Sequence, residues 1–329
     1  MPTRPRAQPA SAVLVWTAIL ILYVVWGSTY LGIRVAIGTI PPFVMAAIRF
    51  AIAGAVMLGA VALVKRGRVV RPSARELRDC FIIGALLMGG GMGTVAWGEL
   101  TVPSGIAGVL IAMMPVWVAV LGRAFFGERL PPMAIVGVAT GMAGVAILVG
   151  SGVALDHSLD AAGVAALIFS PIAWSAGSLF SAHRARLPRD PFLTTGLQML
   201  SGSAVLAVVA LASGEVAAFR PELITTDSLI ALVYLTAIGS LVAFTAYAWV
   251  LRQAPLPLIA TYAFVNPVVA VFLGWLILNE TVTPIQLVAG AVIVIGVALL
   301  IVSRNRMQAP RPAVRPAVAA LDDDAVAVA

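Results

Sequence analysis

One long segment of this sequence occurs twice. Residues 101–132 and 253–284 align without a gap, and each copy holds an apolar stretch with a central proline, a short loop with one glutamate, and the start of another apolar stretch. A repeat of this regularity indicates that the chain is a duplicated half. The matched pairs, all 152 positions apart, are Pro103 and Pro255, Pro115 and Pro267, Gly122 and Gly274, Glu128 and Glu280, and Pro132 and Pro284.

The apolar stretches are too long and too numerous for a water-soluble protein. Hydrophobic residues make up 61% of the 329 positions and charged residues only 11%, whereas soluble domains carry about 25% charged residues. Closed β-barrels alternate apolar and polar residues in short segments, and this chain has long continuous apolar runs instead. Helices of about 20 residues satisfy their own backbone hydrogen bonds in lipid. The sequence therefore predicts an all-α integral membrane protein.

Ten apolar segments can be placed along the chain as membrane spans. Residues 1–11 form an N-terminal arm, and the first apolar run is longer than the core of a signal peptide, so we interpret it as a retained span. Residues 12–150 hold spans one to five, residues 151–303 hold spans six to ten, and the tail 304–329 is expected to be disordered. The expected spans are 12–33, 43–64, 78–98, 104–126, 132–150, 160–182, 192–213, 228–250, 257–278 and 284–302.

Lys and Arg residues are distributed unequally between the two ends of these spans. Of the 21 basic residues, 18 fall on the side of the two termini. Arg34 and Arg220 fall on the other side, and Arg49 lies within a span. The positive-inside rule then places both termini in the cytoplasm.

Five spans per half is an odd number, so equivalent spans must cross the membrane in opposite directions. The loops agree with this, because Arg123 and Arg129 flank the loop of the first copy, whereas the equivalent Trp275 and Thr281 are uncharged. Inverted repeats are typical of secondary transporters, which bind substrate near the midplane between the repeats, although some channels also have them. We expect two inverted five-helix halves around a central cavity.

Several classes of protein are disfavoured by what the sequence lacks. Cys80 is the one cysteine, so no intrachain disulfide or metal cluster is expected, and we expect no cofactor. There is no P-loop, and the basic residues lie between spans, so neither ATP drive nor nucleic-acid binding is expected. His157 and His183 lie at loops or span ends, which argues against an intramembrane enzyme. The expected partners are a small-molecule substrate and membrane lipid; the oligomeric state stays open, and a monomer is compatible with the sequence.

Aromatic and polar side chains recur on one face of several spans and are the candidate cavity residues. Trp26, Thr29 and Tyr30 share a face at i, i+3 and i+4, and Trp174 and Ser178 form a similar face on the sixth span. The alternative for each is packing, or for Tyr30 a place in the interfacial aromatic belt. The remaining candidates are Thr94, Trp97, Met113, Trp117, Tyr247, Tyr262 and Asn266.

Pro115 and Pro267 occupy equivalent positions in the middle of the fourth and ninth spans. A proline kinks a helix, so we expect these spans to gate opposite faces of the membrane, with improved packing as the alternative. Met113 and Asn266 lie beside the two prolines and are expected to face the cavity. Glycines in the third span permit close helix approach or local unwinding along the pathway. They are Gly89, Gly90, Gly91 and Gly93.

Arg49 is the one charged residue clearly within a predicted span, where charge is costly and a partner is expected. Glu99 and Glu280, expected near the same outer side, are the candidates for a structural ion pair; direct contact with substrate is the alternative. Glu128 and Glu280 are expected to cap or tie the two short loops at opposite faces. Because no carboxylate lies deep in a span, we expect efflux with weak or no proton coupling.

Several motifs carry a resemblance to a known family. They are WGSTYLGIR from Trp26, Arg49, VPSGIAGVL from Val102, the Glu128 loop and YAFVNPVVAVFLG from Tyr262. These resemble the drug/metabolite transporter superfamily, and more narrowly its ten-span exporters with two EamA domains, including the YddG-like and YedA-like amino-acid and metabolite exporters.

The resemblance implies export of small metabolites across a bacterial inner membrane by alternating access. Amino acids of broad range, including aromatic and hydrophobic ones, are the expected substrates. A drug, purine or sugar exporter of the same superfamily is the alternative, and a non-transport membrane enzyme or a scaffold is a remote one.

Overall fold

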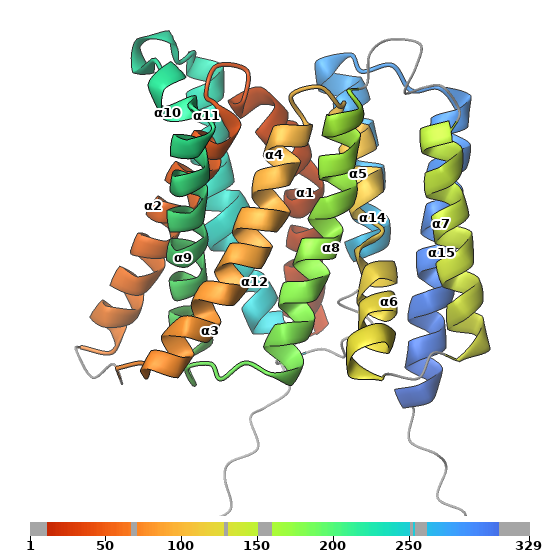
Figure 1. Cartoon of the computed structure of the whole chain (residues 1–329), viewed down its shortest axis with the longest axis horizontal. Coiled ribbons are helices and arrows are strands. Elements are labelled where there is room, and N and C mark those ends of the chain that lie inside the picture. Colours follow the sequence, from red (N-terminus) through yellow and green to blue (C-terminus); the bar gives the residue numbers. More distant parts are fainter. Residues whose placement is uncertain are drawn as a thin grey trace, which may run out of the picture.

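The computed structural model describes residues 12–66, 71–127, 131–150, 160–250, 253 and 262–308. Within these ranges the chain is helical and contains no strand, and its helices stand side by side (Figure 1). Seven helical segments are long and apolar enough to span a membrane, and three shorter apolar helices bring the described spans to ten. The expected all-α membrane fold is confirmed.

The helices of the first half occupy the five expected spans, with ends that differ by a few residues from the expected ones. The third span joins two α-helices through a π-helix, and the fourth is broken in the middle. The elements are α1 (Ala12–Ala36), α2 (Pro42–Val64), α3 (Ala74–Gly84), the π-helix η1 (Ala85–Gly93), α4 (Thr94–Gly98), α5 (Ser104–Ile111), α6 (Met114–Phe126) and α7 (Pro132–Gly150).

The second half repeats this order and adds short helices in one loop. The first residues of the expected ninth span, 257–261, lie outside the described residues. The elements are α8 (Ala161–His183), α9 (Pro191–Ala212), α10 (Glu215–Ala218), the 3₁₀-helix η2 (Pro221–Leu223), α11 (Thr226–Tyr234), the π-helix η3 (Leu235–Val242), α12 (Ala243–Val250), α14 (Tyr262–Leu278) and α15 (Pro284–Gln308).

Prolines begin four of the long helices: Pro42, Pro132, Pro191 and Pro284 are the first residues of α2, α7, α9 and α15. The first turn of a helix has no intrahelical partner for its N–H groups, so the missing donor of proline costs nothing there and its fixed φ favours the helix. Asp190 precedes Pro191 and accepts hydrogen bonds from two nitrogens of the first turn of α9, which completes the cap. The sequence thus marks these helix starts directly.

The two halves pack through equivalent helices, α2 against α9 and α7 against α15. Glycines allow these backbones to approach, because a Cβ on Gly54 would lie 3.0 Å from the Gly196 carbonyl oxygen and one on Gly144 would lie 2.9 Å from the Ile293 nitrogen. Figure 1 shows α7 and its equivalent α15 side by side, one starting at the lower end of the bundle and the other at the upper end. The halves are therefore inverted repeats, as the sequence predicts.

Both third spans contain a π-helix, η1 in the first half and η3 in the second. A π-helical turn widens the helix and shifts the register of the residues that follow, and such turns are frequent at functional sites. Each π-helix adjoins the cavity described below, since Met92 of η1 lines its wall and Ser240 of η3 bonds to Arg49 on that wall.

Candidate functional site

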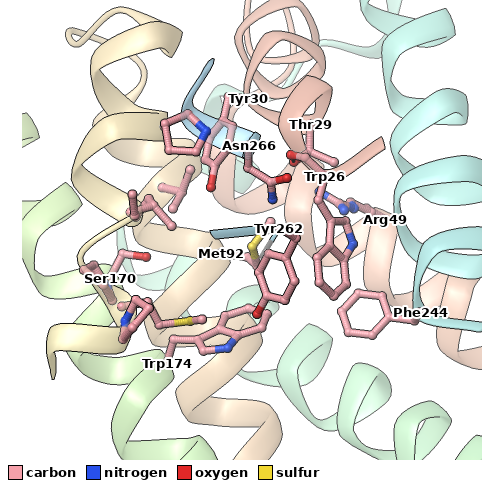
Figure 2. Close-up of a pocket in the computed structure, with 18 of the residues that line it drawn as sticks. Trp26, Thr29, Tyr30, Arg49, Met92, Ser170, Trp174, Phe244, Tyr262 and Asn266 are labelled. Atoms are coloured by element: carbon pink, nitrogen blue, oxygen red, sulfur yellow. Dashed lines mark hydrogen bonds between the residues drawn. The ribbon is translucent and has the colours of Figure 1, made fainter. Parts of the chain in front are cut away.

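A cavity lies between the two halves at mid-length of the spans (Figure 2). Its volume is about 100 Å³ when counted as space open to the centre of a water molecule, several times the roughly 10–15 Å³ that one water needs. A small organic molecule therefore fits. The wall consists of Trp26, Thr29, Tyr30, Arg49, Phe50, Met92, Val95, Gly108, Ile111, Ala112, Met114, Pro115, Ser170, Pro171, Trp174, Phe244, Tyr262, Asn266 and Pro267.

Aromatic rings form one side of this cavity. The centroid of the Trp26 ring lies 5.1 Å from that of Tyr262, 5.2 Å from that of Tyr247 and 5.7 Å from that of Phe244. The Tyr262 and Phe244 contacts are edge-to-face, which is a favourable geometry for aromatic pairs. Tyr247 supports the cluster from behind and is not part of the wall, whereas Trp174 reaches the same space from α8 (Figure 2).

The two polar residues beside the aromatic cluster are held by backbone carbonyl groups. The Thr29 hydroxyl donates to the Trp26 carbonyl oxygen at 2.6 Å. When the Asn266 amide is rotated so that its nitrogen and oxygen exchange places, its nitrogen donates to the carbonyl oxygens of Tyr23 at 3.3 Å and Tyr262 at 3.1 Å. Asn266 therefore ties α14 to α1 at the cavity wall, which is the structural role that an amide in a membrane span commonly has.

The two equivalent prolines line the cavity but shape their helices differently. The fourth span ends as α5 at Ile111 and restarts as α6 at Met114, with Pro115 in the first turn of the new helix. Pro267, in contrast, lies inside the described helix α14. Met114 lines the cavity, and the expectation that Met113 does so is wrong, because the break turns Met113 into the core, where it is 2% exposed.

The glycines Gly89, Gly90, Gly91 and Gly93 serve close packing and are not among the wall residues. A Cβ on Gly90 would lie 2.9 Å from the Ala173 Cβ, and one on Gly91 would lie 2.9 Å from the Trp174 ring. The Ser170 hydroxyl donates to the Gly91 carbonyl oxygen at 2.9 Å and fastens α8 to η1. These glycines therefore set the position of Trp174 on the cavity wall.

Arg49 lies on the wall, and the ion pair expected with Glu99 or Glu280 is not formed. Its Nε donates to the Ser240 hydroxyl at 2.9 Å, and its guanidinium carbon lies 4.9 Å from the centre of the Phe50 ring. In the described part of the chain the salt bridges are Lys65–Asp190 and Arg78–Asp79. The expectation failed because Arg49 lies in the middle of α2, whereas Glu99 follows the end of α4 and Glu280 follows the end of α14.

Glu280 instead caps a helix of the other half. Its Oε1 accepts from the Ser104 nitrogen at 2.8 Å, and its Oε2 accepts from the Gly105 nitrogen at 3.1 Å, both in the first turn of α5. Asn279 adopts a left-handed conformation (φ 53°) at the end of α14, and the Glu280 nitrogen bonds back to the Gly274 carbonyl oxygen at 3.1 Å. This turn aims Glu280 at α5. Glu128, its equivalent, lies outside the described residues.

Glu99 directly follows α4 at the end of the third span and is fully buried. Neither of its carboxyl oxygens has a hydrogen-bond partner in the described chain, because Arg34 donates to the backbone carbonyls of Glu99 and Leu100. Burial, together with the nearby charge of Glu280, raises the pKa of Glu99 well above its ordinary value, and Arg34 opposes this shift. Burial of the carboxyl group therefore favours its protonated form.

The structure places half of the candidate cavity residues on the wall and half away from it. The hydroxyls of Thr94 and Ser178 donate to carbonyl oxygens one turn earlier on their own helices, at 2.5 and 2.8 Å. Trp117 packs against the hydrophobic core. Those on the wall are Trp26, Thr29, Tyr30, Trp174, Tyr262 and Asn266, and those away from it are Thr94, Trp97, Met113, Trp117, Ser178 and Tyr247.

Some wall residues escape sequence reasoning because they are ordinary apolar residues, such as Phe50, Met92 and Phe244. Ser170 and Pro171, in contrast, could have been recognised in the sequence as candidate wall residues. A proline in the middle of the sixth span, preceded by a hydroxyl residue, marks a helix whose backbone is locally freed, and both residues line the cavity.

Comparison with known proteins assigns this chain to a family. The sequence model of the EamA-like transporter family matches residues 14–150 and again residues 161–302. The chain belongs to the EamA-like transporter family. The resemblance to the drug/metabolite transporter superfamily is thus confirmed, and the protein is a membrane transporter.

Individual relatives match over almost the whole chain. The uncharacterized inner membrane transporter YedA of Escherichia coli K12 is 36% identical over 303 residues, which are 92% of this chain and 94% of YedA. A probable terminal-alkyne amino-acid exporter of Streptantibioticus cattleyicolor is 28% identical over 291 residues, 87% of this chain and 92% of that protein. A probable amino-acid metabolite efflux pump of Escherichia coli K12 is 24% identical over 309 residues, 84% of this chain and 91% of that protein.

A solved crystal structure superposes on the fold with a TM-score of 0.61 at 22% identity, over 92% of this chain and 100% of the other. At this identity the likeness shows that the fold is shared.

Proposed function

We propose that this transporter exports small metabolites, above all amino acids of broad range, across the bacterial inner membrane by alternating access. The observation that carries the proposal is a small, mainly apolar cavity with aromatic rings on its wall, built jointly by both inverted repeats, with Pro115 and Pro267 on that wall. Such a site at the repeat interface is where secondary transporters bind substrate. The names of two relatives, an amino-acid exporter and an amino-acid metabolite efflux pump, support the substrate class.

The distribution of charge supports an orientation with both termini in the cytoplasm. In Figure 1 the ends of α2 and α6 and the start of α3 lie at the lower end of the bundle. Lys65 follows α2, Arg71 precedes α3, and Arg123 lies in the last turn of α6. At the other end, the basic residues within the described ranges are Arg34, in the last turn of α1, and Arg220. The positive-inside rule makes the basic end cytoplasmic, so the Glu280 cap on α5 belongs to the outer end.

Alternating access needs contacts between the halves that form in one state and break in another. At the outer end, two contacts of this kind join the halves. Glu280 caps α5 of the first half, and Glu215 accepts hydrogen bonds from the Phe43 and Val44 nitrogens at the start of α2. Each contact joins a carboxylate of the second half to a helix N-terminus of the first, which favours negative charge. We propose that these caps open when the fourth and ninth spans move.

Transport by the purified chain in proteoliposomes tests this function. Vesicles loaded with one unlabelled amino acid are assayed for uptake of labelled phenylalanine, leucine, alanine and glutamate, with unrelated purines and sugars as further arms. We expect exchange of phenylalanine and leucine and little exchange of glutamate, because the described part of the wall carries one cation among apolar groups. Exchange of purines or sugars with no exchange of any amino acid would refute the proposal.

A pair of tryptophan variants ties the activity to the cavity. Trp26→Ala removes the centre of the aromatic cluster, so we expect exchange to fall at least ~10-fold. Trp16→Ala is the control on the same helix, because Trp16 is 49% exposed on the outside of α1. Equal activity of the two variants would place the substrate elsewhere.

A further inference from the structure

Arg49 is a cation on a cavity wall whose other described residues carry no charge. We infer that Arg49 binds the carboxylate of the transported substrate, and that this carboxylate, not an amino group, is the chemical feature the substrates share. The inference rests on the proposed function and deepens it, because it narrows the substrates to small monocarboxylates with an apolar or aromatic body.

The position of Arg49 makes a partner necessary. The residue lies in the middle of α2 and is only 2% exposed. A charged side chain inside a membrane span is costly, and such residues face the protein interior and pair with another group. Leaving a buried charge without a partner is strongly destabilising. The guanidinium of Arg49 therefore needs a partner at the cavity wall.

The described chain satisfies the guanidinium only in part. A guanidinium has five N–H donors, and one of them, on Nε, bonds to the Ser240 hydroxyl at 2.9 Å. Within the described ranges no carboxylate forms a salt bridge with Arg49. The remaining donors are left for a group that enters the cavity. An anion is the group that satisfies both the donors and the charge.

The Ser240 contact also orients the guanidinium. Ser240 lies on the π-helix η3, and the neighbouring Gly239 leaves room for Arg49, because a Cβ there would lie 3.3 Å from Nη2. With Nε fixed, the edge that carries the two Nη atoms is held in one orientation. A carboxylate matches such a fixed edge with two parallel hydrogen bonds, a geometry that lysine does not offer.

The rest of the wall indicates what the carboxylate is attached to. The rings of Trp26, Phe244, Tyr262 and Trp174 line the same cavity as Arg49 (Figure 2). An apolar or aromatic body fits against these rings. No acidic side chain belongs to the described wall, so a substrate ammonium finds no charge partner there and its loss is tolerated.

A ligand series tests the inference on the unmodified protein. Binding to the full chain in detergent is followed by tryptophan fluorescence, since Trp26 and Trp174 line the cavity. The probes are phenylalanine, 3-phenylpropanoate (no amine), phenylalaninamide (no carboxylate) and phenethylamine (neither carboxyl group nor amide). We expect the two acids to bind with similar affinity and the amide and the amine to bind at least ~30-fold more weakly, the loss produced by removing one partner of a buried charge pair.

Equal binding of the amide and the acid would overturn the inference and leave the proposed export function intact. Binding of 3-phenylpropanoate together with a failure to transport any amino acid would refute the proposed export of amino acids and leave the role of Arg49 intact. The two proposals therefore fail separately.

Variants locate the effect. Arg49→Gln is expected to abolish the preference for acid over amide, and Arg49→Lys to retain only part of it. Arg220→Gln, in an outer loop where the side chain bonds to nearby backbone carbonyls, is the control and should behave as the original chain. An unchanged preference in folded Arg49→Gln overturns the inference. If that variant does not fold, Ser240→Ala releases Nε and should weaken acid binding while leaving amide binding unchanged.

Discussion

Glu280 Oε1 accepts a hydrogen bond from the Ser104 nitrogen at 2.8 Å and another from the Ser104 hydroxyl at 2.9 Å. The two residues are 176 positions apart and belong to different halves. Glu280 thus acts as an N-cap supplied by the other repeat, where a carboxylate also interacts favourably with the helix dipole. The contact therefore joins the end of α14 in the second half to the start of α5 in the first.

We expect Glu280→Ala to lower the free energy of unfolding by about 1 kcal/mol, the usual value of a lost helix cap. Glu280→Gln keeps an acceptor oxygen and should lose less. Thermal unfolding in detergent measures both. Glu222→Ala, at an exposed site in η2, is the control and should leave the melting temperature unchanged. Equal melting temperatures for Glu280→Ala and the control would show that the cap contributes nothing.

Glu99 makes stability depend on pH. Its pKa is raised by burial, so the folded chain binds a proton that the unfolded chain releases at a lower pH. The corresponding stability is complete below the ordinary carboxyl range, near pH 4.3, and is lost as pH rises through the raised pKa. We expect Glu99→Gln to remove this fall in melting temperature at rising pH, whereas Glu222→Gln keeps it. Parallel pH profiles for Glu99→Gln and the original chain would contradict the assignment.

The repeat and the long apolar runs were enough to predict the all-α fold in two halves. The length of the apolar runs and the odd number of spans per half are local or counting properties, so they transfer directly to structure. The break in the fourth span was not predictable, because the repeat alone gives Pro115 and Pro267 the same environment. As a result Met113 was expected on the wall in place of Met114.

The charged residues show a different limit. Hydropathy places Glu99 just beyond its span, so the sequence gives no sign that the turn folds back and buries it completely. The expectation of weak proton coupling relied on the absence of a carboxylate deep within a span, and it stays a prediction, because the buried Glu99 follows the end of its span. Likewise, the partner of Arg49 depends on which groups lie at the same depth, which a linear sequence does not specify.

Gly91 controls the position of Trp174. A Cβ at this position would lie 2.9 Å from the Trp174 ring, so Gly91→Ala should displace the ring from the cavity and lower stability by about 1–3 kcal/mol, as overpacking does. Gly59→Ala on α2 is the control, because nothing lies within 4 Å of its Cβ and replacement of glycine in a helix stabilises by about 0.5–1 kcal/mol. Substrate exchange and melting temperature measure the two effects. Normal substrate exchange by Gly91→Ala would show that transport does not depend on the position of the Trp174 ring.

Two glycines on α15 test how the halves are joined. A Cβ on Gly296 would meet backbone atoms of α7, including the Gly137 carbonyl oxygen at 2.7 Å, and a backbone cannot rotate away as a side chain does. Gly296→Ala should therefore force α7 and α15 apart, with a loss of about 1–3 kcal/mol. Gly290→Ala should be tolerated, because its Cβ would make only an ordinary contact with Val109 at 3.7 Å. If the two variants melt at the same temperature, close glycine packing is not what holds this pair of equivalent helices together.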